Sequence, residues 1–263
     1  MTDWQAIADA DFAVPPGADP AALAAELAGA LADPDPQIRD GAAYSVLATW
    51  IKRGVLDSQL SWLGDTMAAR FADERIQART FAPLVLEWVI ERGGFDPDWV
   101  RAFELWYPAE TDLRGYDAEL GWLHAVAHGA DLLGALGRHQ QVEPEAMLKL
   151  AAQRMLADSS FVWRDQEDDR LGYAMARTLS RPGLTTEQST GWLDLVDSRF
   201  AAGEPGPVPP FASNTIRTLR MLYLLADRGV RGAPGEEAEP FANREEVMQR
   251  IANSFSVVAW FAG

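Results

Sequence analysis

Recurrent Asp-Pro pairs divide this chain into segments of helical length. They occur at residues 19–20, 33–34, 35–36 and 96–97. In such a pair the aspartate accepts hydrogen bonds from the first turn of a helix, and the proline fits the first helical position. Glycines fall where such helices would end, at positions 54, 93, 183, 203 and 229. No convincing alternation of polar and apolar residues indicates a strand, and no Asn-Gly or Asp-Gly hairpin turn joins two such runs. These signals predict an all-α protein.

The apolar periodicity then places the helices and the segments between them. We expect helices over residues 20–32, 36–53, 58–71, 75–92, 97–107, 117–138, 144–157, 166–180, 186–202, 213–229 and 244–261. Most connections are short, which favours antiparallel neighbours. The Pro- and Gly-rich stretch 203–211 and the stretch 230–242 are expected to be loops.

Two segments resemble each other at an offset of 38 to 40 residues. Both 32–54 and 72–93 contain Ala-Asp, then an arginine, two apolar residues, a tryptophan and a final Arg-Gly. This period, with two helices per unit, is typical of HEAT-type repeats. We therefore predict one domain over 1–263, a right-handed α-α superhelix (a HEAT-like solenoid of antiparallel helix pairs). Residues 1–19 would form an N-terminal extension and 244–261 a capping helix. A non-repetitive helical bundle is the alternative.

The composition excludes several classes of function. The formal net charge is −16, whereas binding to nucleic acids and to anionic membranes depends on basic side chains. The absence of cysteine excludes disulfides, thiolate catalysis, Fe–S clusters and thiolate zinc sites. No apolar stretch approaches the roughly 18 residues of a membrane span, and no secretion signal is visible. A cytoplasmic protein is expected, with no membrane contact and with nucleic acid an improbable partner.

Residues 121–136 carry the clearest candidate for chemistry. His124 and His128 stand four residues apart, and Asp131 follows three residues later in an otherwise apolar segment. On one helix these three side chains would share a face. Polar groups in an apolar helix cost free energy unless they have partners. We expect the trio either to be a site or to belong to a buried network.

Three interpretations of this trio stay open. One is a divalent-metal site with His124, His128 and Asp131 as ligands, since the histidine spacing matches that of zinc-protease helices. Position 125 is alanine, so the general base of such proteases is absent. The second interpretation is metal-free catalysis in which Asp131 orients a histidine that transfers protons. The third is a structural hydrogen-bond network between helices.

Two further clusters of polar residues could flank the trio. Residues 165–169 hold four carboxylates at a predicted helix start, where acids complement the helix dipole. Alternatively, Asp165 or Asp168 faces the histidines. Arg217, Arg220 and Tyr223 share helix faces, either as ion-pair partners of those acids or as an anion-binding patch. Tryptophans 50, 62, 88, 106, 122 and 192 are expected in the core, although an aromatic-lined groove would use a few of them, such as Trp122.

Three segments also resemble a known family. The match is carried by the pattern Asp112-Leu-Arg-Gly-Tyr116 with Gly121-Trp-x-His-Ala-Val-Ala-His-Gly-Ala-Asp-Leu-Leu133, by residues 167–171, and by Arg217-x-x-Arg-x-Leu-Tyr223. They resemble the signature of a bacterial domain-of-unknown-function family, numbered 2785. The resemblance covers roughly residues 20–230 and is weakest in the N-terminal fifth. It implies an α-α superhelical fold and almost no biochemistry.

Two functions are therefore expected as alternatives. The first is an enzyme acting on a small polar molecule at a concave-face site, with His124, His128 and Asp131 as catalytic residues, with or without a divalent metal. Trp122, Asp165, Asp168, Arg217, Arg220 and Tyr223 would contact the substrate. The second is a solenoid adaptor that binds another protein, with the His/Asp trio structural. No dinucleotide-binding, phosphate-loop or Ser/His/Asp signature supports a more specific assignment.

Overall fold

The protein is all-α in a computed structural model, which describes residues 2–204, 206–256 and 258. Its contacts divide the chain into two compact units. Unit 1 comprises Met1–Trp106 and Arg114–Leu132, and unit 2 comprises Tyr107–Leu113 and Leu133–Gly263. The prediction of one continuous domain stays a prediction.

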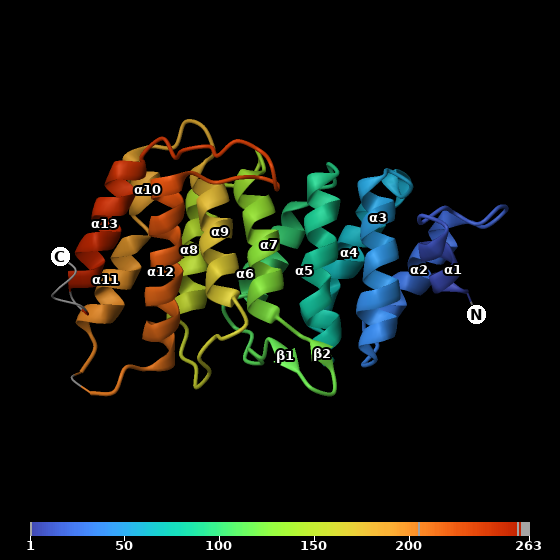
Figure 1. The fold of residues 1–263 in the computed structure, drawn as a ribbon, viewed down its shortest axis with the longest axis horizontal. Helices are drawn as coiled ribbons and strands as arrows, with labels where there is room; N and C mark the ends of the chain where they lie inside the picture. The colour runs from blue at the N-terminus through green and yellow to red at the C-terminus, as the bar shows by residue number, and fades with distance from the viewer. Residues whose placement is uncertain (1, 205, 257, 259–263) are drawn as a thin grey trace. The chain divides into compact units, whose positions relative to one another are not determined.

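Unit 1 holds the helices drawn from blue to teal in Figure 1 and the short hairpin β1–β2. Its core is apolar and includes Leu47, Ile51, Leu63, Val85 and Val89. The helix α4 packs against α5 and α6, and α3 packs against α5. The elements are α1 (Trp4–Asp9), α2 (Pro20–Ala30), the π-helix η1 (Gln37–Tyr44), α3 (Ser45–Lys52), the 3-10 turn η2 (Asp57–Gln59), α4 (Leu60–Arg70), α5 (Ile76–Glu91), α6 (Pro97–Trp106), β1 (Tyr116–Asp117) and β2 (Gly121–Trp122).

Three of the four Asp-Pro pairs stand at helix starts as predicted, at 19–20, 35–36 and 96–97, whereas the pair at 33–34 lies in the loop before η1. The Asp19 carboxylate accepts from the Ala21 N–H at 3.0 Å, with Pro20 as the first residue of α2. Asp96 accepts from the Asp98 N–H at 2.8 Å at the start of α6. Residues 1–19, predicted as an N-terminal extension, contain the helix α1, which was not predicted. Here α1 packs on α3, and the Trp50 indole donates to the Phe12 carbonyl at 2.7 Å.

The two similar segments, 32–54 and 72–93, also form matching hydrogen bonds in unit 1. Arg39 donates through Nη1 to the carbonyls of residues 33 and 34, at 3.1 and 3.3 Å. Arg79 donates through Nη1 to the carbonyls of residues 73 and 74, at 2.8 and 2.9 Å. The carboxylates of Asp33 and Asp73 each accept from the backbone N–H two residues later. The loop before Arg39 and the loop before Arg79 therefore have the same hydrogen bonds, 40 residues apart in the sequence.

The predicted helix 117–138 is wrong in its first part. Residues 116–122 form a hairpin in which Tyr116 pairs with Trp122 and Asp117 with Gly121. The helix α7 (Ala125–Arg138) begins only after His124. The expectation of no strands fails here for a local reason. Gly121 has φ +70°, and a Cβ at this position would lie 2.8 Å from the Pro36 Cβ, so the backbone closes against the loop before η1.

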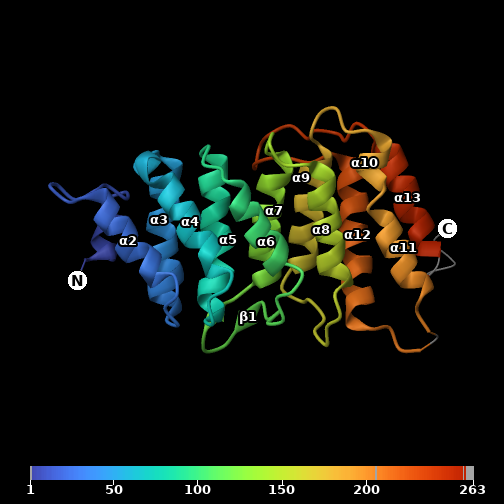
Figure 2. The ribbon, with the colours of Figure 1, turned by 180° about the vertical axis from the view of Figure 1, so that it is seen from behind.

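Unit 2 is drawn from yellow-green to red in Figures 1 and 2, and it also contains the last residues of α7. The segment predicted as a capping helix, 244–261, is helical over Arg244–Ser256. Beyond it, residues 257 and 259–261 of the predicted helix lie outside the described residues. The segment 230–242 contains an antiparallel bridge between Val230 and Glu239. The elements of unit 2 are α8 (Pro144–Leu156), α9 (Glu167–Leu179), α10 (Thr186–Thr190), α11 (Leu193–Ala201), α12 (Pro210–Arg228) and α13 (Arg244–Ser256).

Small residues bring the helices of unit 2 close together. A Cβ at Gly134 of α7 would lie 3.3 Å from the Ala174 Cα of α9. A Cβ at Gly172 would lie 3.0 Å from the Met221 Cβ of α12. The packing of α9 along α12 follows from this close approach. Gly134 therefore lets α9 approach α7 closely.

Gly64 of α4 makes a similar approach in unit 1 and gives a stability prediction. A Cβ at this position would overlap the ring of Trp99, which is buried and donates to the Asp65 carboxylate at 2.8 Å. Gly64→Ala is expected to destabilise the protein by about 1–3 kcal/mol, because overpacking outweighs the roughly 1 kcal/mol gained in helix propensity. Urea unfolding measures this. The control is Gly29→Ala, an exposed position in α2 where an added Cβ would contact no other part of the protein within 4 Å and stability should rise. Equal changes in both variants would contradict the prediction.

Candidate functional site

The hairpin of unit 1 is stabilised by its own turn residue. The Asp117 carboxylate accepts from the backbone N–H groups of Glu119 and Leu120 at 2.9 and 3.0 Å, and from Arg114 Nη1 at 2.7 Å. These bonds, chiefly those from the two backbone N–H groups, lower the pKa of Asp117. The side chain therefore mimics a backbone turn and directs the chain back into β2.

His124 occupies the position between this hairpin and α7. Its φ of +52° is left-handed, a conformation that costs free energy in a residue other than glycine and that is concentrated at functional sites. Its backbone N–H donates to the Arg114 carbonyl at 3.0 Å, and its carbonyl accepts from the His128 N–H at 2.9 Å. His124 thus precedes the helix but remains one turn before His128.

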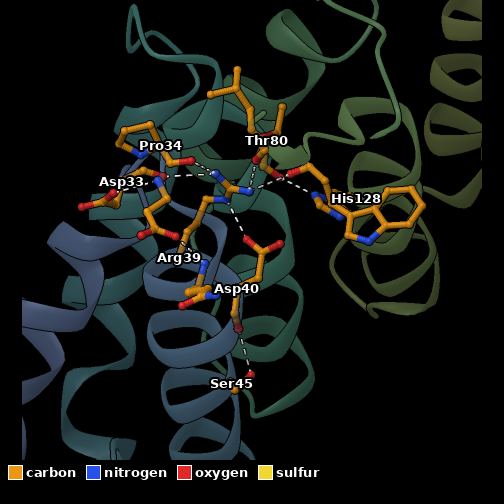
Figure 3. Close-up of polar contacts among 11 residues, drawn as sticks. Asp33, Pro34, Arg39, Asp40, Ser45, Thr80 and His128 are labelled. Atoms are coloured by element: carbon orange, nitrogen blue, oxygen red, sulfur yellow. Dashed lines mark hydrogen bonds and ion pairs between the residues drawn. The ribbon is translucent and has the colours of Figure 1, made fainter. Parts of the chain in front are cut away.

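The imidazole of His128 is oriented by α5. Its Nδ1 lies 2.9 Å from the Thr80 carbonyl oxygen, and Figure 3 draws this contact as a dashed line. Pro83 lies inside α5 and has no N–H to donate to the carbonyl four residues earlier, that of residue 79. Because a carbonyl can only accept, Nδ1 of His128 carries a proton. In the neutral ring the lone pair is then on Nε2.

Aromatic rings surround the two histidines. The Trp122 indole stacks on the His124 ring, with centroids 4.6 Å apart and planes inclined by 26°. The rings of His124 and His128 meet edge to face at 5.6 Å, and Phe81 meets His128 at 5.2 Å. The histidines are 8% and 7% exposed, whereas Trp122 is 42% exposed. The two predicted histidines therefore lie in contact with each other, and the Trp122 indole that stacks on His124 is exposed to solvent.

Arg39 is a residue of this site that the sequence did not single out for function. Its side chain is completely buried. Nη2 donates to the carbonyls of Leu120 and Trp122 at 2.6 and 3.2 Å, and Nε pairs with the Asp40 carboxylate at 2.7 Å (Figure 3). Burial raises the pKa of Asp40, opposed by the charge and hydrogen bond of Arg39. The only sequence signal was the place of Arg39 in the internal similarity.

The metal interpretation has no support in the geometry. Among the described residues, no group of three or more His, Asp or Glu side chains is arranged to hold a metal ion. His124 lies outside α7, so the three predicted ligands do not extend from one regular helical stripe. Asp131 lies on α7 and is partly exposed. Its role in orienting a histidine stays a prediction.

The predicted flanking residues lie in unit 2. The Asp168 carboxylate pairs with Arg217 Nε at 2.6 Å, and Arg217 Nη2 also donates to the Trp163 carbonyl. For Arg217 the interpretation as an ion-pair partner is therefore confirmed. Asp165 donates its backbone N–H to the Glu167 carboxylate at 2.8 Å. That Asp165 or Asp168 faces the histidines stays a prediction.

The remaining predicted residues of unit 2 lie on the surface. Arg220 and Tyr223 of α12 are both exposed, and their contact with a substrate stays a prediction. The acids at residues 167–169 occupy the first turn of α9, as predicted, and burial raises the pKa of Glu167. Of the tryptophans expected in the core, Trp50, Trp106 and Trp192 are buried, Trp88 is intermediate, and Trp62 is exposed, contrary to the prediction. Trp122, for which a groove was the alternative to the core, is exposed.

The chain belongs to a family described as a protein of unknown function (DUF2785), whose sequence model matches residues 69–224. The match includes the hairpin, both histidines and the blocks at 167–171 and 217–223, and it begins after Arg39. Neither a curated protein nor a solved structure matches the chain. Within the described residues, no helix has the length and apolar character needed to cross a membrane.

Proposed function

We propose that the protein is an enzyme that acts on a small polar molecule by proton transfer at His128. The observation that carries this proposal is the 2.9 Å contact between His128 Nδ1 and the Thr80 carbonyl. It fixes the tautomer and the orientation of the ring, which is the usual way in which proteins prepare a histidine for acid–base work. A cytoplasmic location is part of the proposal.

The other residues of the site have consistent roles in this scheme. Nε2 of His128 takes a proton from the substrate and later returns it. The exposed Trp122 offers an aromatic face near the imidazoles, against which a substrate can stack. His124, whose ring meets that of His128 edge to face with centroids 5.6 Å apart, is the second imidazole of the scheme. The low exposure of both histidines strengthens electrostatic interactions there by limiting contact with water.

We also propose the finer description of the fold, a HEAT-like α-α superhelix. It is supported by the matching loop contacts of Arg39 and Arg79 within unit 1. In a repeat protein, a contact between an arginine and the loop before its helix would recur in each unit and keep the same connection between successive helix pairs.

The enzyme proposal is tested with an extract of polar metabolites. The wild type and His128→Asn are incubated with the extract, which is then followed by mass spectrometry. At least one compound should be consumed by the wild type only, and the product mass separates hydrolysis from isomerisation. Consumption of no compound, or equal consumption by both proteins, would contradict the proposal. Affinity of the unchanged protein for a protein partner would then favour the adaptor interpretation.

A further inference from the structure

The buried guanidinium of Arg39 joins two parts of unit 1 that are distant in sequence. Nη1 binds the loop before η1, and Nη2 binds the hairpin carbonyls of Leu120 and Trp122, 81 and 83 residues away. The planar group also lies over the Phe81 ring, 4.8 Å from its centroid. A buried cation is costly unless its donors are satisfied with good geometry, and here they are.

Comparison with Arg79 separates two uses of this arginine. Both arginines use Nη1 to bind the loop that precedes their own helix. This contact belongs to the repeat and explains why an arginine stands at both positions. The bonds from Nη2 of Arg39 to the hairpin come in addition, and they end at the carbonyl of the tryptophan that stacks on His124.

We propose that Arg39 is a positioning residue of the histidine site, which acts by fixing Trp122 over His124. The backbone at the intervening Gly121 fits this role, since a Cβ there would lie 3.3 Å from Arg39 Nη2. The backbone of the hairpin therefore packs directly against the Arg39 guanidinium. The catalytic part of this inference rests on the proposed function, whereas the placement of Trp122 does not.

The test compares Arg39→Lys with the matched control Arg79→Lys. Lysine keeps the positive charge but lacks the planar guanidinium, which donates both to the loop before η1 and to the hairpin. The readout is the imidazole Cε1–H signal of His124 by NMR, in a protein with three histidines. The ring current of Trp122 displaces this signal, and Trp122→Ala gives its position without the stack. In Arg39→Lys the signal should move to that position, while in Arg79→Lys it should stay.

Turnover adds a second readout once a substrate is known. Displacing Trp122 should lower kcat/KM about 10- to 100-fold in Arg39→Lys, because small misplacements at a site are costly, and not in Arg79→Lys. If Arg39→Lys is folded and the His124 signal is unmoved, the inference is wrong. If the signal moves but no metabolite is consumed by the wild type, only the proposed function fails.

A second variant covers the case in which Arg39→Lys does not fold. Arg39→Met/Asp40→Asn removes both charges and so leaves no buried ion without its partner. It also lacks the donors to the hairpin, so the His124 signal should again coincide with that of Trp122→Ala. A signal at the wild-type position would overturn the inference.

Discussion

Replacing His128 by asparagine is expected to lower turnover by about 10²- to 10⁴-fold, the usual contribution of a general acid or base. The asparagine amide can occupy the place of Nδ1 and still donate to the Thr80 carbonyl, but it has no counterpart of Nε2. The variant therefore removes the proton-transferring atom and keeps the hydrogen bond that a structural role would need. Steady-state kinetics on the substrate identified from the extract measures the loss.

The third histidine provides the control. His139 is partly buried in unit 2, where burial and the nearby Arg181 lower its pKa. His139→Asn should leave kcat and its pH dependence unchanged, whereas His128→Asn should also remove an ionisation from the pH–rate profile. If His128→Asn retains full activity and the wild-type pH profile, then the contact with Thr80 is structural and the proposed mechanism is wrong.

The histidine pair was predictable because its geometry is local. A spacing of four residues places two side chains one turn apart. The predicted helix began too early, yet the bond from the His128 N–H to the His124 carbonyl preserves that turn. The Asp-Pro pairs and the glycines with positive φ at positions 54, 93, 183 and 229 were predictable for the same reason, since caps depend on a few adjacent residues.

The hairpin was not predictable from periodicity. Each strand has two residues, which is too short for an alternating pattern. Its closure depends on the side chain of Asp117 and on Arg39, which lies far away in the sequence. Because the hairpin takes residues 117–122 out of the predicted helix, the sequence alone could not show that Trp122 stacks on His124.

Buried arginines are difficult to predict in general, since arginine is usually exposed and its burial depends on partners elsewhere in the chain. Arg39 and Arg154 illustrate this. Each donates to backbone carbonyls more than 40 positions away, at residues 120 and 122 for Arg39 and at 107 and 110 for Arg154. Carbonyls are present in every residue, so no side-chain motif marks these partners.

Arg154→Ala is expected to reduce the free energy of unfolding by about 2–5 kcal/mol, the range for truncating a large buried side chain to alanine. Arg154 is only 2% exposed, and its Nη1 donates to the carbonyls of Tyr107 and Glu110, both at 2.8 Å. Burial lowers the pKa of Arg154, while Tyr107 and Glu110 oppose this shift by favouring the charged form. Alanine would leave both buried carbonyls without this donor and would open a cavity beside α8.

Two further variants separate the causes, with urea unfolding as the measurement. Lys149→Ala removes an exposed ion pair with Glu145 from the same helix and should cost at most about 1 kcal/mol, because exposed pairs contribute little. Arg154→Met keeps an apolar stem in place and should recover the part of the loss that is due to the cavity. If Arg154→Ala is no more destabilising than Lys149→Ala, the segment 107–110 is held by its apolar contacts. The buried guanidinium would then contribute no net stability to unit 2.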